Sequence, residues 1–451
     1  MKIRSCWSVA RRIVSLMIAV GLLGTLGTGF RGISWSPRGV SELLGPAPLF
    51  AGDWPQILGP ERSGVATDER LAESWPASGL TPTWTYSLGQ GYAGPAVVGQ
   101  RVLVFHRVDG VERLEALDRL TGKPVWKADF PTTYRSGIDP DAGPRAVPLV
   151  AGDSVYVWGV QGELRAVGLT DGKLRWRRQL GEELRAEEGY FGAGSTPLLV
   201  AEKLIVNVGG RNGAGLVAID PQTGKTVWQA TDEGASYAAP TSAQIQGKTA
   251  AVFATRLNCV AVEAATGEVL FRLPFGKRGP TVNAATPLVF DQRLFLSASY
   301  GIGGQLYRLD QATPQRVWGN DETLSSQYAT AVWHDGYLYG THGREDSAAE
   351  GRLAELRCVT AASGEVKWSV PDFGVAHVIR AGDHLLVVQV RGRVLLGKAT
   401  PSGWKELASA QVTKGSEATR ALPALAHGQL LLRTNSGSQG GRLISLPVGK
   451  E

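Results

Sequence analysis

Leu114 to Trp126 reads LEALDRLTGKPVW, and Leu216 to Trp228 reads LVAIDPQTGKTVW. Both stretches follow the pattern apolar-x-Ala-x-Asp-x-x-Thr-Gly-Lys-x-x-Trp, which is typical of a β-hairpin. The Asp can accept hydrogen bonds from the backbone of the turn, and the Gly tolerates the positive φ that a tight turn requires. The final Trp offers a large flat surface for packing. We therefore expect two antiparallel strands in each copy, with the Trp packed between neighbouring repeats.

The hairpin recurs with a period of roughly 45 residues, which is the length of a four-stranded propeller blade. Weaker copies end at Trp176, Phe271, Trp318, Trp368 and Trp404. Each copy follows an apolar strand pair with the period-two alternation of half-buried strands. Most of these pairs open on a small residue and a proline, and the eight blocks begin near Pro95, Pro148, Pro197, Pro240, Pro287, Ala331, Val378 and Pro423.

The eighth block lacks a terminal aromatic residue, whereas Trp84 has no strand pair before it. We therefore expect the strand around Trp84 to complete the last blade, so that both ends of the repeat region close one ring. Closure of this kind hides strand edges that would otherwise promote aggregation. The predicted fold is all-β, an eight-bladed β-propeller of four-stranded antiparallel blades over residues 52–451. We expect it to be monomeric.

Residues 1–51 differ from the rest of the chain. They carry six basic residues and one acidic residue, which accounts for most of the formal net charge of +6. A basic start followed by the apolar run Ile13 to Phe30 is typical of an export signal, with an uncleaved inner-membrane anchor as the alternative. We expect the chain to lie outside the cytoplasm, in the periplasm or cell envelope, and to contact membrane only through this segment. The near-neutral remainder argues against nucleic acid as a partner.

The three cysteines do not indicate a disulfide or a lipid anchor. Cys6 precedes the apolar run, whereas the lipid-bearing cysteine of a lipoprotein signal follows one. Cys259 and Cys358 lie in non-adjacent repeats, so we expect buried structural thiols.

The Ala-x-Asp-x-x-Thr-Gly-x-x-x-Trp repeat resembles that of the pyrroloquinoline quinone (PQQ) propellers over about residues 53–449. The segment Asp53-Trp-Pro-Gln56, with Gly59-Pro60 and Ser63-Gly-Val65 after it, resembles the start of the bacterial envelope group called PQQ-binding-like. The wider family includes PQQ-dependent dehydrogenases of alcohols and sugars, and a lipoprotein propeller of outer-membrane assembly. The resemblance implies the fold, but one fold hosts many unrelated functions.

The dehydrogenase branch implies a quinone on the propeller axis, Ca²⁺ held by acidic and amide oxygens, and a catalytic Asp. This chain has no adjacent cysteine pair and no haem-attachment motif. Its one dense acidic stretch, Asp139-Pro-Asp141, is interpreted as a polar turn. The six histidines show no metal-ligand spacing. The sequence therefore predicts no catalytic residue and no metal site, with PQQ and Ca²⁺ kept as an alternative.

One set of residues remains a candidate site. If the first strand of each block lines the axis, the residue three before its opening position faces the channel mouth. Three tyrosines and two arginines there could hold a flat anion by stacking and bidentate hydrogen bonds. Together with two neighbours in register, the tentative cofactor-binding ring comprises Tyr92, Arg145, Tyr237, Asn283, Tyr328, His377 and Arg420.

Three functions remain open from the sequence. The preferred one is a non-catalytic envelope propeller that binds a protein, peptide or polymer. The second is a PQQ-dependent oxidoreductase of alcohols or sugars, favoured by the Tyr/Arg ring. The third is a component of outer-membrane protein assembly, which the misplaced cysteine weakens.

Overall fold

The computed structural model describes residues 52–187, 189–279, 281–311, 313–345 and 353–450. The chain divides into two units, Met1–Gly45 and Pro46–Glu451. The predicted export signal or anchor lies outside the described residues, so it and the proposed boundary at residue 51 stay predictions. None of the helices in the described part of the chain is both long and apolar enough to span a bilayer.

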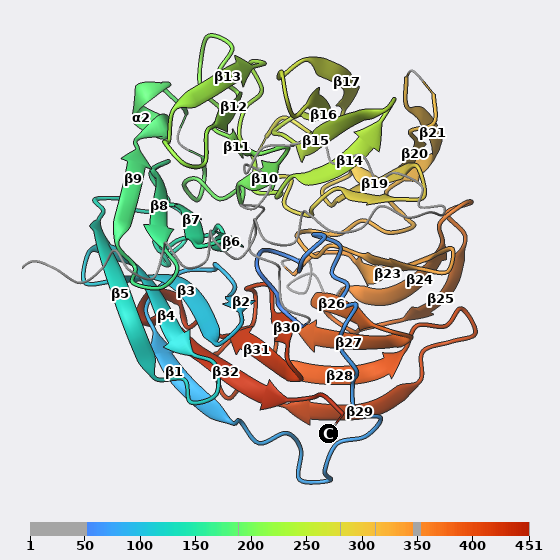
Figure 1. Ribbon diagram of the computed structural model, residues 1–451. Helices are drawn as coiled ribbons and strands as arrows, with labels where there is room; N and C mark the ends of the chain where they lie inside the picture. Colours follow the sequence, from blue (N-terminus) through green and yellow to red (C-terminus); the bar gives the residue numbers. More distant parts are fainter. Residues whose placement is uncertain (1–51, 188, 280, 312, 346–352, 451) are drawn as a thin grey trace, which may run out of the picture. The chain divides into compact units, whose positions relative to one another are not determined.

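In the described part of Pro46–Glu451, the strands form eight four-stranded antiparallel sheets arranged in a ring (Figure 1). This confirms the predicted eight-bladed propeller. From the axis outward, the first four blades comprise β2 (Ala96–Val98), β3 (Arg101–Val108), β4 (Val111–Asp118) and β5 (Pro124–Pro131); β6 (Leu149–Ala151), β7 (Ser154–Trp158), β8 (Leu164–Gly168) and β9 (Leu174–Arg178); β10 (Leu198–Val200), β11 (Lys203–Asn207), β12 (Leu216–Ile219) and β13 (Thr226–Ala230); and β14 (Thr241–Ile245), β15 (Lys248–Ala254), β16 (Asn258–Glu263) and β17 (Val269–Pro274).

The next three blades follow the same order, and two short helical turns in the described part of the chain lie outside the sheets. These elements are β18 (Leu288–Phe290), β19 (Arg293–Ala298), β20 (Gly303–Arg308) and β21 (Gln315–Asn320); β22 (Val332–His334), β23 (Tyr337–His342), β24 (Glu355–Thr360) and β25 (Val366–Val370); β26 (Ala376–Ala381), β27 (His384–Gln389), β28 (Arg393–Lys398) and β29 (Glu406–Gln411); α2 (Leu180–Glu183); and the 3-10 turn η3 (Gly437–Gln439).

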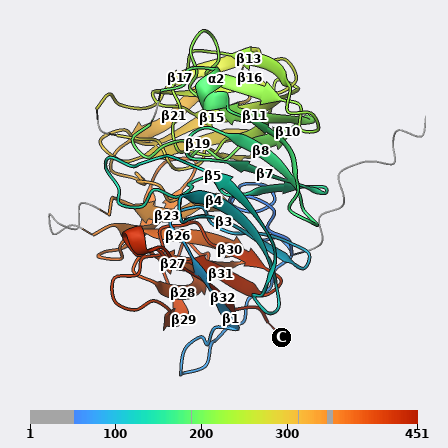
Figure 2. The ribbon, with the colours of Figure 1, turned by 90° about the vertical axis from the view of Figure 1, so that its left-hand side faces the viewer.

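The eighth blade joins the two ends of the repeat region, as predicted. It contains β30 (Ala424–Ala426), β31 (Gln429–Arg433) and β32 (Gly441–Pro447), and its outer strand is β1 (Trp84–Leu88). Trp84 lies opposite Ser445, and β1 runs antiparallel beside β32 in both views (Figures 1 and 2). The ring is therefore closed by main-chain hydrogen bonds between segments that are far apart in sequence.

The repeat pattern has a direct structural cause. In the first copy, the amide and hydroxyl of Thr121 donate to the Asp118 carboxylate, which fixes the turn. Trp126 lies opposite the small Ala116, and its indole N–H donates to the Leu169 carbonyl of the next blade at 2.9 Å. Its ring covers Gly172, where a Cβ atom would lie 2.4 Å from the indole. The repeat glycine thus also makes room for the Trp of the preceding blade.

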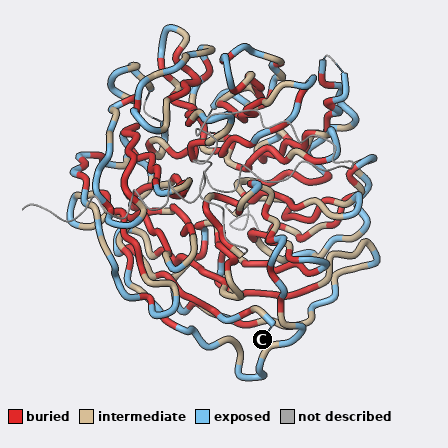
Figure 3. Tube along the Cα trace, viewed as in Figure 1, coloured by how far each residue is buried: buried red, intermediate tan, exposed pale blue. Residues whose placement is uncertain are grey.

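We call this contact between a Trp and the Gly of the next blade, with its hydrogen bond, the clamp. Its hydrogen bond recurs around the ring. The indole N–H groups of the other blade tryptophans donate to the next blade at Arg119 (from Trp84), Pro221 (from Trp176), Ala264 (from Trp228), Ala361 (from Trp318) and Thr400 (from Trp368). Burial follows the same geometry, since the middle strands are buried and the outer strands are largely exposed (Figure 3). The predicted packing of Trp residues between blades is confirmed.

One copy departs from the prediction. Trp404 precedes β29 instead of lying within it, and Ala408 takes the position opposite Leu396 that Trp126 holds opposite Ala116. Trp404 covers Gly397 of its own blade, where a Cβ atom would lie 2.3 Å from the indole. Its ring also lies 6.3 Å from that of Trp368 of the sixth blade, so Trp404 packs against the preceding blade.

The two predicted structural thiols are both buried and free. Burial raises the pKa of Cys358 to about 11 and raises that of Cys259 further. Such thiols are unreactive at neutral pH.

Candidate functional site

The propeller has two different faces. The mouth face carries the loops between consecutive blades and the loops between second and third strands, such as 132–148 and 159–163. The turn face carries the tight turns between first and second strands and between third and fourth strands, such as 99–100 and 119–123. All seven predicted ring residues precede or begin innermost strands, which places them on the mouth face.

An axial segment, residues 53–66, crosses the centre of the ring. Trp54 and Val97 of β2 exchange main-chain hydrogen bonds of 2.8 Å, and the Val150 amide of β6 donates to the Pro55 carbonyl at 2.9 Å. Farther along, the Ala66 amide donates to the Arg380 carbonyl of β26 at 2.8 Å. The segment therefore contacts innermost strands on different sides of the axis (blue trace at the centre of Figure 1).

Arg62 anchors this segment. Its side chain is 2% exposed, and its guanidinium donates to the Pro240 carbonyl at 2.9 Å, to the Pro197 carbonyl and, through Nε, to Gln56 Oε1 at 2.7 Å. Burial lowers the pKa of Arg62 to about 9. A buried cation held by carbonyl oxygens is retained only where each donor has a partner. The axis is thus filled by the chain itself.

At the mouth, one group of predicted residues comes together around Arg145. Its guanidinium lies 4.9 Å from the centroid of the Tyr92 ring and 3.1 Å from Asp141 Oδ1. The Tyr92 hydroxyl donates to Asp139 at 3.0 Å. Burial, then the charges of Asp139 and Asp141, raises the pKa of Tyr92 to about 12. Tyr237 is close to this group, since a Cβ atom on Gly194 would lie 2.6 Å from its ring and 3.1 Å from Arg145 Cβ.

A second group forms around Glu345, which the sequence interpretation missed. Arg420 Nε donates to Glu345 Oε2 at 2.9 Å, and the Tyr328 hydroxyl donates to the same oxygen at 2.9 Å. The Tyr328 ring lies 5.8 Å from the ring of His377, whose Nε2 donates to the Arg420 carbonyl at 2.8 Å. Burial raises the pKa of Tyr328, and Glu345 raises it further. Burial lowers the pKa of His377 to about 4.

Asn283 is separate from both groups. It is buried, and its amide nitrogen donates to the Thr255 carbonyl at 2.7 Å and to the Phe275 carbonyl at 3.0 Å. It therefore ties together the chain just past the ends of β15 and β17. The acidic stretch Asp139–Asp141 is confirmed as a turn, because the Asp141 amide donates to Asp139 Oδ1 at 2.8 Å. Within the described ranges, no group of three or more His, Cys, Asp or Glu side chains is arranged to hold a metal ion.

A family model described as outer membrane protein assembly factor BamB, of the PQQ-like repeat type, matches residues 65–231 and, overlapping them, residues 110–370. The chain belongs to this family. Its relatives include the outer membrane protein assembly factor BamB of Burkholderia pseudomallei, which is 26% identical in an alignment of 302 residues that covers 56% of this chain and 73% of that protein. The protein of the same name from Alkalilimnicola ehrlichii is 33% identical over 143 residues, which are 31% of this chain and 32% of that protein.

A solved structure shows the same fold. The crystal structure of BamB from Moraxella catarrhalis superimposes with a TM-score of 0.57 at 16% identity, and the match covers 81% of this chain and 99% of the other. The predicted membership of the PQQ-like propeller family is therefore confirmed by sequence and by fold.

The name of the PQQ-like family raises the question of whether its quinone fits here. PQQ is a flat tricarboxylate and needs unpaired cationic donors. At the mouth, Arg145 faces Asp141 and Arg420 faces Glu345, so both guanidinium groups already have carboxylate partners. The Asp139 carboxylate adds a further negative charge beside Arg145, through its contact with Tyr92. In this arrangement the ring residues do not fit PQQ.

Proposed function

We propose that this chain is a non-catalytic binding scaffold of the cell envelope that takes part in the assembly of outer-membrane proteins. Its family and its relatives carry the name of an outer membrane protein assembly factor. This supports the sequence-based expectation of an envelope propeller that acts by binding. The basic, apolar start of the chain supports a location outside the cytoplasm.

Two features of the structure carry the proposal: the axial segment fills the centre of the ring, and the arginines at the mouth are paired with carboxylates. The axial segment occupies the centre of the ring, and Arg62 is satisfied by carbonyl oxygens of the inner strands. The arginines of the mouth are paired within the chain. Among the residues that the structure describes, this arrangement leaves an axial quinone without a cradle, so the oxidoreductase alternative is not supported by the geometry. We therefore assign binding of a partner to the exposed loops.

We further propose that the mouth face, not the turn face, contacts the partner protein. The mouth face carries the long loops, which are the usual position of binding residues on a rigid scaffold. Ile138 lies in one of these loops and is 63% exposed, although aliphatic side chains of this size are usually buried. Leu120, in a tight turn of the opposite face, is 61% exposed and provides a matched control.

Site-specific photo-crosslinking tests this proposal in cells that produce the full chain. A benzophenone amino acid replaces Ile138 or Arg211 on the mouth face, or Leu120 on the turn face. We expect discrete adducts with envelope proteins from the two mouth positions and none from Leu120. Adducts from Leu120 alone, or none from any position, would refute the assignment of the face. Unchanged levels of outer-membrane proteins after deletion of the gene would refute the role in assembly.

A further inference from the structure

A cavity of about 880 Å³ opens on the mouth face beside the ring, between the loops of the second, third and fourth blades. Its walls are rich in glycine because the loops pack backbone against backbone. A Cβ atom on Gly209 would lie 2.6 Å from the Ala235 nitrogen, and one on Gly192 would lie 2.7 Å from the Val160 carbonyl oxygen. The cavity is therefore preformed, and its volume suits a ligand of several rings or residues.

The main chain of the walls offers little to a ligand. The Ala193 amide donates to the Val160 carbonyl at 2.8 Å, and the Gly209 amide donates to the Gly215 carbonyl at 3.1 Å. The Gly181 amide likewise donates to the Gly162 carbonyl at 2.9 Å. A peptide that binds as an added strand needs a row of unpaired main-chain groups. The main-chain groups named here are bonded to one another within the walls. A ligand must therefore be held mainly by side chains.

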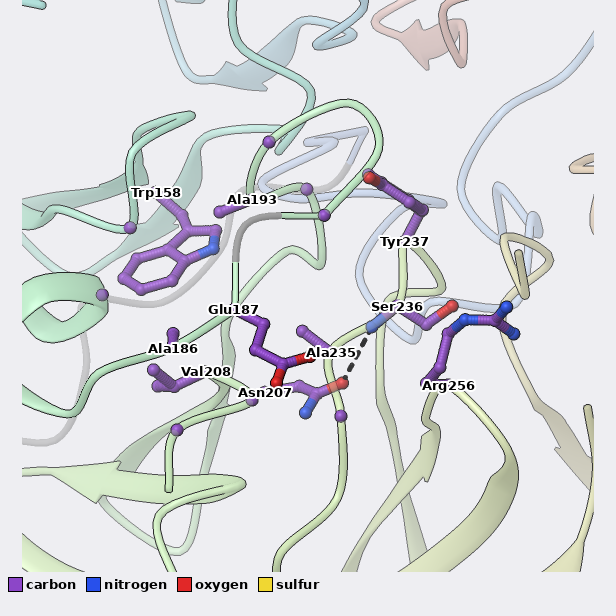
Figure 4. Close-up of a pocket in the computed structure, with 18 of the residues that line it drawn as sticks. Trp158, Ala186, Glu187, Ala193, Asn207, Val208, Ala235, Ser236, Tyr237 and Arg256 are labelled. Carbon is purple, nitrogen blue, oxygen red and sulfur yellow. Dashed lines mark hydrogen bonds between the residues drawn. The ribbon is translucent and has the colours of Figure 1, made fainter. Parts of the chain in front are cut away.

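Two tyrosine side chains at the cavity supply a donor and a stacking surface. Trp158 forms a buried wall behind them, at 1% exposure. The Tyr237 hydroxyl accepts from the Phe191 amide at 2.7 Å, which leaves its own proton available to donate. Figure 4 shows Trp158 and Tyr237 on two sides of the cavity. Tyr190, at 43% exposure, offers an accessible ring face at the rim.

Charges of both signs surround the opening. Arg211 and Arg256 line it together with Glu182, Glu187 and Asp232, so cations and carboxylates nearly balance. A polyanion gains little from such a rim. A neutral ligand that combines apolar faces with many hydroxyl or acetamide groups can use the aromatic rings, the donors and the carboxylates together.

We propose that this cavity binds a neutral oligosaccharide, with a sugar ring stacked on Tyr190 and a ligand oxygen that accepts from the Tyr237 hydroxyl. This is a second binding activity, independent of the proposed role in assembly. A peptide in the same cavity is the competing possibility, which the test distinguishes.

Isothermal titration with chitotetraose, a tetramer of N-acetylglucosamine, and with maltotetraose tests the proposal on the chain without its first 51 residues. A capped, uncharged hexapeptide of alternating valine and threonine is titrated in parallel. The variants are Tyr190→Ala, Tyr237→Phe and the matched control Tyr300→Ala, which alters the second cavity of the mouth face. Urea unfolding of each variant verifies that it is folded.

We expect saturable binding of at least one oligosaccharide below about 10 mM, weakened about tenfold or more by Tyr190→Ala and unchanged by Tyr300→Ala. The Tyr237→Phe variant should also bind the oligosaccharide less tightly, because it lacks the hydroxyl that donates to the ligand. Absence of oligosaccharide binding, equal weakening by Tyr190→Ala and Tyr300→Ala, or saturable binding of the hexapeptide instead would overturn the inference. None of these outcomes alters the crosslinking test of the mouth face.

Discussion

The contact between Trp126 and Gly172 permits a quantitative test of how the blades are joined. Gly172 has φ +66°, and a Cβ atom there would lie 2.4 Å from the indole of the preceding blade. Gly172→Ala should therefore cost about 1 kcal/mol for the positive φ and about 2 kcal/mol more for displacement of the indole. Trp126→Ala removes the ring and should cost about 3 kcal/mol, the lower end for a large aromatic residue because this one is half-buried.

In the double variant the added methyl group no longer meets the indole, so only the backbone cost remains. We expect a total of about 4 kcal/mol where simple addition gives about 6, that is, a coupling of about 2 kcal/mol. Gly110→Ala is the matched control, because Gly110 has φ +80° and nothing within 4 Å of an added Cβ atom. It should cost about 1 kcal/mol.

Equilibrium unfolding in urea, monitored by tryptophan fluorescence and checked for reversibility, measures all four variants. If Gly172→Ala costs no more than Gly110→Ala, the glycine serves the turn alone. If the single variants add within about 0.5 kcal/mol, the two residues are energetically independent. Either result would refute the interpretation of the Thr-Gly and Trp positions as one clamp.

Three further predictions concern the axis and the mouth. Arg62→Met should cost about 3 kcal/mol in thermal unfolding, because it leaves buried carbonyl oxygens without a donor; a loss below about 1 kcal/mol would contradict the role of Arg62 as an anchor. Burial lowers the pKa of His377 to about 4 in the folded chain, against about 6.5 when unfolded, so its contribution is present above pH 6.5 and is lost as the pH falls toward 4. His377→Gln should remove about 2.4 kcal/mol of that pH dependence, measured as the difference in unfolding free energy between pH 7 and pH 4.5, and an unchanged dependence would contradict the burial of a neutral His377. PQQ with Ca²⁺ should give no saturable thermal shift, although a ligand at a hundred times its Kd adds about 2.7 kcal/mol; a shift that Arg145→Ala and Arg420→Ala abolish would show that the mouth ring does hold the quinone.

Most of the fold could be predicted because each blade is specified locally. Asp118, Gly122 and Trp126 lie within nine residues, and their spacing determines the turn and the position of the Trp. The partner of Trp126, Gly172, holds the same position in the next copy as Gly122 in the first. The departure at Trp404 could not be foreseen, because the position of a Trp in a degenerate copy does not say whether it lies in the outer strand or before it. Only the strand register, with Ala408 opposite Leu396, decides this.

The site was predictable only in part. Spacing from the prolines placed the tyrosines and arginines at one mouth, but it could not reveal their partners. Glu345 reaches Arg420 from a loop 75 residues away in sequence, and no local pattern marks that contact. The sequence identified the axial segment by its resemblance to the family but did not place it on the axis. Arg62 binds main-chain carbonyl groups, and these leave no pattern in the sequence of side chains.

The way in which Arg62 is held also affects which mutations the inner strands can accept. Every residue has a carbonyl oxygen, so replacement of a side chain on the inner strands leaves the acceptors of the guanidinium in place. Random mutagenesis should therefore find many tolerated replacements beside the acceptor positions and few at Arg62 itself. The chain can therefore vary the side chains that line its channel while the axial segment stays anchored there.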